Sequence, residues 1–105
     1  MQERRSDVRA RCEVGAVVET TDGEVVFRGT CFDVSERGFC VQSLESVQEI
    51  TTEPLFVTIG NRLTGITALA QLAWSDGLTH GFQAVAMMPY QRKKLRGLVA
   101  SLSQS

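Results

Sequence analysis

Two short polar segments contain the residue types in this chain that could do chemistry. The first, Arg4–Arg9 (RRSDVR), places three guanidinium groups within six residues. A guanidinium group is planar, permanently charged and forked, so it can hold a phosphate through two parallel hydrogen bonds or bind the O6 and N7 edge of guanine. The second, Asp33–Gly38 (DVSERG), is a turn of short polar side chains that follows a strand-like stretch. The first segment therefore predicts an anionic partner.

The charge balance favours a small anion over a polymer. The formal net charge is -1, so the protein as a whole has no field that would draw it to DNA or to an anionic membrane. No stretch is long and apolar enough to span a bilayer. We therefore expect neither a nucleic acid polymer nor membrane insertion. Outside the first segment, positive charge gathers in a group that we interpret as the solvated face of a helix: Arg92, Lys93, Lys94 and Arg96.

The cysteines indicate a reducing compartment and no catalysis. Their number, three, and their spacing match neither a disulfide framework nor a zinc site, and nothing near the N-terminus supplies the apolar core of a signal peptide. A cytoplasmic location is predicted. Cys12, Cys31 and Cys40 are interpreted as core residues, because a catalytic cysteine needs a histidine and the chain has only His80, which we expect to face solvent. The scattered acidic residues suggest neither acid–base chemistry nor a metal site. We predict no enzymatic activity and no cofactor.

Hydrophobic periodicity predicts six strands and one helix within a single domain. Alternation is clear from Cys12 to Glu19, and Asp22-Gly23 and Asp76-Gly77 are typical of tight turns. The predicted strands are 12–19, 24–32, 39–44, 55–59, 63–74 and 80–87. The alanines and leucines of 63–74 could also form a helix, and Trp74 within it is interpreted as a core or rim aromatic. After Pro89 the period changes to that of an amphipathic helix.

These elements predict a mainly β fold, a small antiparallel barrel whose open end or side the terminal helix covers. We divide the chain into a flexible arginine-rich arm, a barrel and a C-terminal helix, at residues 1–11, 12–88 and 89–105.

Together the polar segments resemble the signature of the PilZ domain family, an arginine pair with a second arginine four residues on, followed by a D/N-x-S-x-x-G turn. Residues 70–74 (AQLAW) followed by Gly81-Phe82 resemble the family's late hairpin, so the resemblance covers nearly the whole chain. It implies a six-stranded PilZ-type barrel with a C-terminal helix. It also implies binding of the bacterial second messenger cyclic di-GMP, with the arginine arm folding over a ligand held on the barrel surface. The implied ligand-binding residues are Arg4, Arg5, Arg9, Asp33, Ser35 and Gly38.

The chemistry of these residues suits that ligand. Arginines can neutralise its two phosphates and read or stack on its two guanines, and each bidentate pair is worth roughly 1–3 kcal/mol of discrimination. Asp33 can accept from the N1–H and N2–H₂ edge of guanine, and Ser35 offers a small hydroxyl. Gly38 permits a positive φ or a close approach of backbone to a base. By the same resemblance, the additional Arg4 is associated with a self-stacked pair of ligand molecules.

Three hypotheses follow. The first is a stand-alone cyclic di-GMP receptor, a monomer or weak dimer, that signals to an unidentified downstream protein. The second is a PilZ-like protein-interaction module that does not bind nucleotide. It is motivated by Asp7 and Val8, where bulky residues are frequent in the family; Asp7 could pair with an arginine, although an exposed pair is worth only about 0–1 kcal/mol. The third is an RNA-binding barrel, for which no stacking aromatics accompany a basic strand face. Without the first segment, Asp33–Gly38 would be read as a plain turn.

Overall fold

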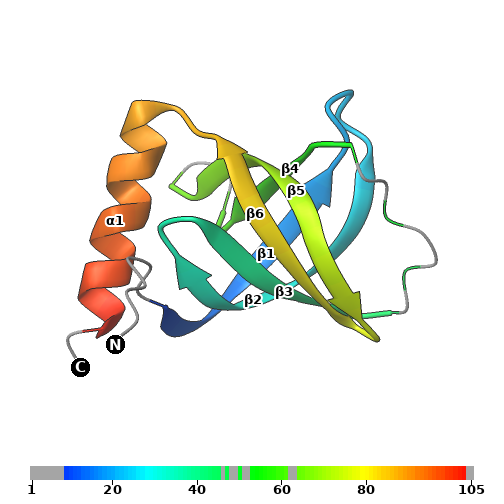
Figure 1. Cartoon of the computed structure of the whole chain (residues 1–105), viewed down its shortest axis with the longest axis horizontal. Coiled ribbons are helices and arrows are strands. Elements are labelled where there is room, and N and C mark those ends of the chain that lie inside the picture. Colours follow the sequence, from blue (N-terminus) through cyan, green and yellow to red (C-terminus); the bar gives the residue numbers. More distant parts are fainter. Residues whose placement is uncertain (1–8, 46, 48–49, 51–52, 62–63, 104–105) are drawn as a thin grey trace, which may run out of the picture.

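Six antiparallel strands close into a barrel in the computed structural model, which describes residues 9–45, 47, 50, 53–61 and 64–103 (Figure 1). The strands follow the order β1-β2-β3-β6-β5-β4 around the barrel. Helix α1 follows the last strand. The predicted mainly β fold with one C-terminal helix is confirmed. The elements are β1 (Ala10–Glu19), β2 (Val25–Ser35), β3 (Gly38–Ser43), β4 (Leu55–Ile59), β5 (Ile66–Asp76), β6 (Thr79–Ala86) and α1 (Pro89–Ser103).

All six predicted strands are present, but the residues at which most of them begin and end differ from the prediction. β4 has the predicted bounds, and β5 shows that the helical alternative for 63–74 is wrong. β1 begins at Ala10 instead of Cys12, and Ala10 and Arg11 pair with Val34 and Asp33 of β2. These two residues, which the prediction assigned to the arm, therefore belong to the barrel. Residues 1–8 of the predicted arm lie outside the described residues.

Two β-bulges interrupt the alternation of inward and outward side chains next to the polar turn. In β2, Phe27 and Cys31 face the core, and a register shift between Cys31 and Asp33 makes Val34 the next buried residue. In β5, a shift between Leu72 and Trp74 ends the inward series in the same way. A bulge adds one residue to one strand and re-aims the side chains beyond it. Asp33 and Trp74 are thereby placed outside the core.

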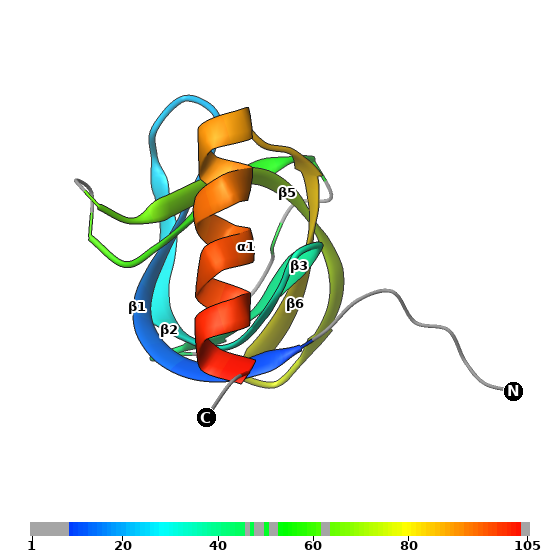
Figure 2. The same ribbon diagram turned by 90° about the vertical axis from the view of Figure 1, so that its left-hand side faces the viewer.

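Helix α1 covers one end of the barrel (Figure 2). Pro89 occupies its first turn, where a missing N–H costs nothing. Leu95 and Val99 are fully or almost fully buried and join the barrel core, with Leu98 and Leu102 partly buried beside them. α1 packs against β1, β2 and β5. Within the described residues, no helix has the length and apolar character that crossing a membrane requires.

Candidate functional site

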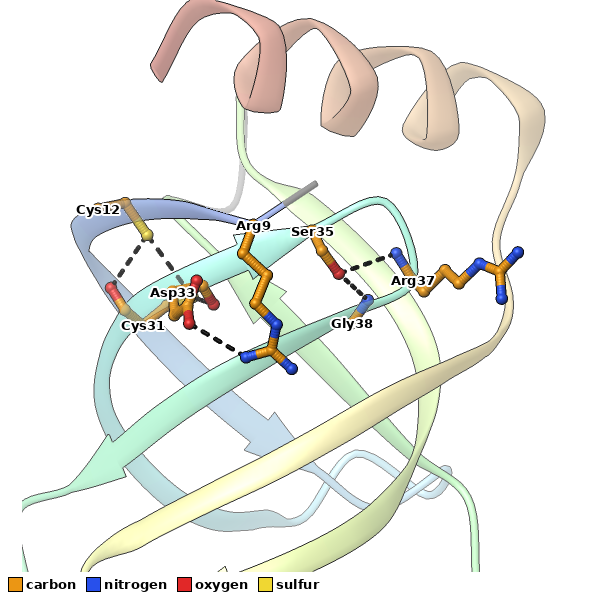
Figure 3. Close-up of polar contacts among 7 residues, drawn as sticks. All are labelled: Arg9, Cys12, Cys31, Asp33, Ser35, Arg37 and Gly38. Atoms are coloured by element: carbon orange, nitrogen blue, oxygen red, sulfur yellow. Dashed lines mark hydrogen bonds and ion pairs between the residues drawn. The ribbon is translucent and has the colours of Figure 1, made fainter. Parts of the chain in front are cut away.

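Arg9 and Asp33 bring the two polar segments together. Arg9 immediately precedes β1, and the pairing of Arg11 with Asp33 sets the start of β1 against the end of β2. The Nη1 atom of Arg9 lies 3.3 Å from Oδ2 of Asp33, and their side chains are 58% and 23% exposed (Figure 3). This is a single contact and not a bidentate fork, so it is worth about 0–1 kcal/mol. Either group could therefore exchange its partner for a ligand at little cost.

Ser35 has a structural role in the turn. Its side chain is buried, and its Oγ accepts hydrogen bonds from the backbone N–H groups of Arg37 and Gly38, both at 3.2 Å (Figure 3). A hydroxyl that accepts from residues two and three positions on is an ST turn, the plain interpretation that the sequence left open. The oxygen of Ser35 thus closes the turn.

Gly38 is required by the neighbouring strand. Its φ is not positive, because the glycines of the described residues with positive φ are Gly23, Gly60 and Gly77. Of the two alternatives that the sequence offered for Gly38, a positive φ and a close approach of backbone, the first is therefore wrong. A methyl group at Gly38 would instead collide with the carbonyl oxygen of Phe82 on β6. The close backbone approach that Gly38 permits is therefore between β3 and β6. Its proposed contact with a base stays a prediction.

A hollow of about 220 Å³ lies beside this turn. Arg9, Asp33 and Arg37 contribute its charged groups, and β5 and β6 contribute the opposite wall with Trp74, Gly81 and Gln83. Pockets that enclose drug-sized ligands usually measure roughly 300–1,000 Å³. A ligand as large as a dinucleotide would therefore lie over this hollow with part of its surface outside it.

Trp74 forms the aromatic part of the hollow. It pairs with Gly81 across the β5–β6 ladder and is 45% exposed, so it lies at the rim and not in the core. Any side chain at Gly81 would collide with the indole ring, so the ring can pack against the backbone there only because residue 81 is glycine. An exposed, fixed indole beside cationic groups is a suitable surface for stacking a base. The sequence signal was a tryptophan and a glycine seven residues apart, flanking the Asp76-Gly77 turn.

His80 is buried, so the prediction that it faces solvent is wrong. Its Nε2 lies 3.2 Å from Oγ of Ser43 and its Nδ1 lies 2.6 Å from Oγ of Ser75. Ser43 donates its own proton to the carbonyl of Glu45 at 2.8 Å, so we assign the Nε2–H tautomer, with Nδ1 accepting from Ser75. Burial lowers the pKa of His80, which keeps the ring neutral. His80 thus anchors the β5–β6 hairpin next to Gly81.

The thiols are unsuited to nucleophilic chemistry. Cys31 and Cys40 are buried, as predicted, and Cys12 is half-buried. Desolvation by burial raises the pKa of all three thiols, and the Asp33 carboxylate raises those of Cys12 and Cys40 further. Because the thiolate is the reactive form, these groups stay largely unreactive near neutral pH. In the part of the chain that the structure describes, no group of histidine, cysteine or acidic residues could hold a metal ion.

The structure therefore brings together four of the six predicted site residues: Arg9, Asp33, Ser35 and Gly38. Arg4 and Arg5 lie outside the described residues. The same hollow is also lined by residues that sequence reasoning did not assign to the site, among them Arg37 and Trp74. The carbonyl of Arg37 accepts a hydrogen bond of 2.7 Å from the N–H of Ala84, which ties the turn to β6.

Several solved structures have the same fold, and one of those described below was solved with c-di-GMP. A PilZ domain of YcgR from Escherichia coli, solved with c-di-GMP, is 15% identical, with a TM-score of 0.73 over 97% of this chain and 93% of that one. The PilZ domain of CeSA from a cellulose-synthesizing bacterium is 20% identical, with a TM-score of 0.66 over 90% and 97%.

The inhibitor of motility MotI/DgrA from Bacillus subtilis is 16% identical, with a TM-score of 0.77 over 98% of this chain. This chain spans only about half of that protein, 53%. At these identities the likeness establishes the fold. No curated protein matches the chain with significant sequence similarity. The family model of the PilZ domain, however, matches residues 3–101. With nearly the whole chain covered, this protein belongs to the PilZ domain family.

Proposed function

We propose that this chain is a bacterial cyclic di-GMP receptor domain that acts in the cytoplasm as an adaptor. The observation that carries the proposal is the meeting of Arg9 with Asp33 at one hollow, because the arginine motif and the D-x-S-x-x-G turn are far apart in the sequence. Membership of the PilZ family and the likeness to a PilZ domain solved with c-di-GMP support it.

Each group around the hollow suits one part of the ligand. The Arg9 guanidinium can bind a phosphate or the O6 and N7 edge of guanine, and Asp33 can accept from the opposite guanine edge. Trp74 offers an indole face on which a second base can stack. The Ser35 oxygen and Gly38 hold the turn in the shape that presents Asp33.

The arginine arm would complete the site. Four residues of extended chain reach roughly 13 Å, so Arg5 can return over the hollow from Arg9, and Arg4 can add charge if two ligand molecules stack. The hollow of about 220 Å³ leaves part of a dinucleotide for the arm to cover. The arm would lose conformational freedom on closing, and this ordering converts ligand binding into a signal for a downstream protein.

Calorimetric titration with cyclic di-GMP tests the proposal. We expect micromolar or tighter binding by the wild type at low salt, with binding lost in Arg9→Ala and Asp33→Ala. Arg28→Ala removes an exposed arginine of β2 that does not line the hollow, so it should bind like the wild type. Trp74 fluorescence should change during the same titration. If the wild type releases no heat and Trp74 does not respond, the proposal is refuted.

A second candidate function is a protein-interaction module that has kept the fold without the ligand. Asp7 and Val8 motivate it, because bulky residues are frequent at these positions in the family. In that case a partner protein should be captured equally by the wild type with and without cyclic di-GMP, and the calorimetric titration should be flat.

A further inference from the structure

The charged residues separate towards the two ends of the barrel. At the end far from α1, the described residues include six carboxylates: Glu19, Asp22, Glu24, Glu45, Glu53 and Asp76. One cation, Arg28 of β2, lines a pocket with Glu45 there. At the end that α1 covers, they include seven cations against three carboxylates: Arg9, Arg11, Arg37, Arg92, Lys93, Lys94 and Arg96 against Glu13, Asp33 and Glu36. The protein has a net charge close to zero, but its negative and positive charges are therefore concentrated at opposite ends of the barrel.

Helix α1 carries most of the positive charge at its end. It contains four cations and no acidic residue. Its apolar side chains face the barrel, so its opposite face is turned outward (Figure 2). Two of the cations are held in place at the edges of the helix, where Lys94 Nζ donates to the carbonyl of Gly65 at 3.2 Å and Arg96 Nε lies 3.4 Å from the Glu36 carboxylate. Arg92 and Lys93 are exposed beside them.

Two large exposed side chains flank these cations. Met88 precedes α1 and is 60% exposed, and Tyr90 in its first turn is 59% exposed. A tyrosine ring has an apolar body and a polar tip, which suits the boundary between lipid headgroups and acyl chains. Cationic side chains with an amphipathic aromatic at one end are the composition of a surface that rests on anionic lipid.

We infer that the outer face of α1 is a docking surface for an anionic lipid bilayer. A lipid surface requires distributed positive charge and little shape complementarity. Helix α1 provides four cations from Arg92 to Arg96, over little more than one turn, followed by the small residues Gly97 and Ala100. Lysine is depleted at the core of protein interfaces, and two of the four cations of α1 are lysines. The six carboxylates at the far end would be repelled by the same lipid, which orients the molecule with α1 against it. The inference does not depend on nucleotide binding.

Vesicle co-sedimentation tests this inference on the full chain. The probes are vesicles of equal parts phosphatidylcholine and phosphatidylglycerol and vesicles of phosphatidylcholine alone. We expect binding to the anionic vesicles only, weakening as salt is added. Each cation near such a surface contributes about a fivefold factor in binding, so Lys93→Gln should weaken binding about fivefold and the Arg92→Gln, Lys93→Gln double variant roughly twenty-five-fold.

Arg28→Gln is the matched control, because it removes the same charge from the barrel wall. It should leave vesicle binding unchanged, and thermal melting of every variant should match the wild type. Three outcomes would overturn the inference: no binding to anionic vesicles at low salt, equal binding to both vesicle types, or an equal loss in Arg28→Gln and Lys93→Gln. In the first of these, an acidic protein becomes the better occupant of this face.

Discussion

Replacing Ser35 with alanine should destabilise the ligand-free protein. The substitution removes the acceptor of two backbone N–H groups, those of Arg37 and Gly38. Each buried donor left without an acceptor costs about 1–3 kcal/mol. The two bonds are part-buried and 3.2 Å long, at the long end of the usual range, so we expect a total loss of about 2–3 kcal/mol. For a domain of about this size that loss lowers the melting temperature by roughly 8–20 °C.

Urea and thermal denaturation without ligand measure this effect. Ser101→Ala removes an exposed hydroxyl from α1 and should change the free energy of unfolding by less than about 0.5 kcal/mol. If Ser35→Ala were as stable as the wild type, the assignment of its hydroxyl to the turn would be wrong. A stable variant that had also lost cyclic di-GMP binding would instead make Ser35 a direct ligand contact.

Other substitutions test the packing around the site, all by urea denaturation followed by circular dichroism. Gly38→Ala forces a methyl group against the Phe82 carbonyl and should lower the free energy of unfolding by about 1–3 kcal/mol or more. Its control, Gly97→Ala, fills open space in a helix and should raise the free energy of unfolding by about 1 kcal/mol. Equal stability of the two variants would contradict the close approach of β3 and β6 at Gly38. Leu95→Ala should cost about 2–5 kcal/mol, because Leu95 is fully buried between α1 and the barrel; a smaller loss would mean that the helix packs loosely. Burial lowers the pKa of His80 below its ordinary 6.5, so its contribution to stability is complete above that pH and is lost as the pH falls below it. His80→Gln should therefore reduce the acid sensitivity of the free energy of unfolding. An unchanged pH profile would mean that His80 does not cause the acid sensitivity and would contradict the lowered pKa.

The barrel was largely predictable because strand alternation is a local property. Each strand has buried residues on one face, and the Asp-Gly turns take the positive φ that only glycine adopts easily, as at Gly23 and Gly77. The bulges were not predictable in the same way. Counting by twos placed Trp74 in register with Ile66, Ala68 and Ala70, and one extra residue before Trp74 moved it from the core to the rim of the hollow.

Whether a polar contact could be predicted depended on how far apart its two residues lie in the sequence. The Ser35 turn is closed within three residues, so its plain structural reading was available from the sequence alone. His80 looked exposed because it follows a turn, yet one of its hydrogen-bond partners, Ser43, is 37 residues away on another strand. The proximity of Arg9 to Asp33, 24 residues apart, was anticipated only through the family resemblance. Pairings of this range depend on the register of strands, which local patterns do not determine.

Strand topology also explains how a net charge near zero can hide a separation of charge. Each strand of the barrel reverses the direction of the one before it in the sequence, so the β1–β2, β3–β4 and β5–β6 connections gather at one end. The β2–β3 turn, the start of β1 and α1 gather at the other. Acidic residues occupy the first set of segments and most cations occupy the second. The net charge of -1 is a sum in which the negative end and the positive end largely cancel. The exclusion of anionic surfaces that it suggested concerns the field of the whole molecule at long range, and the inferred docking surface concerns the local charge on the face of α1.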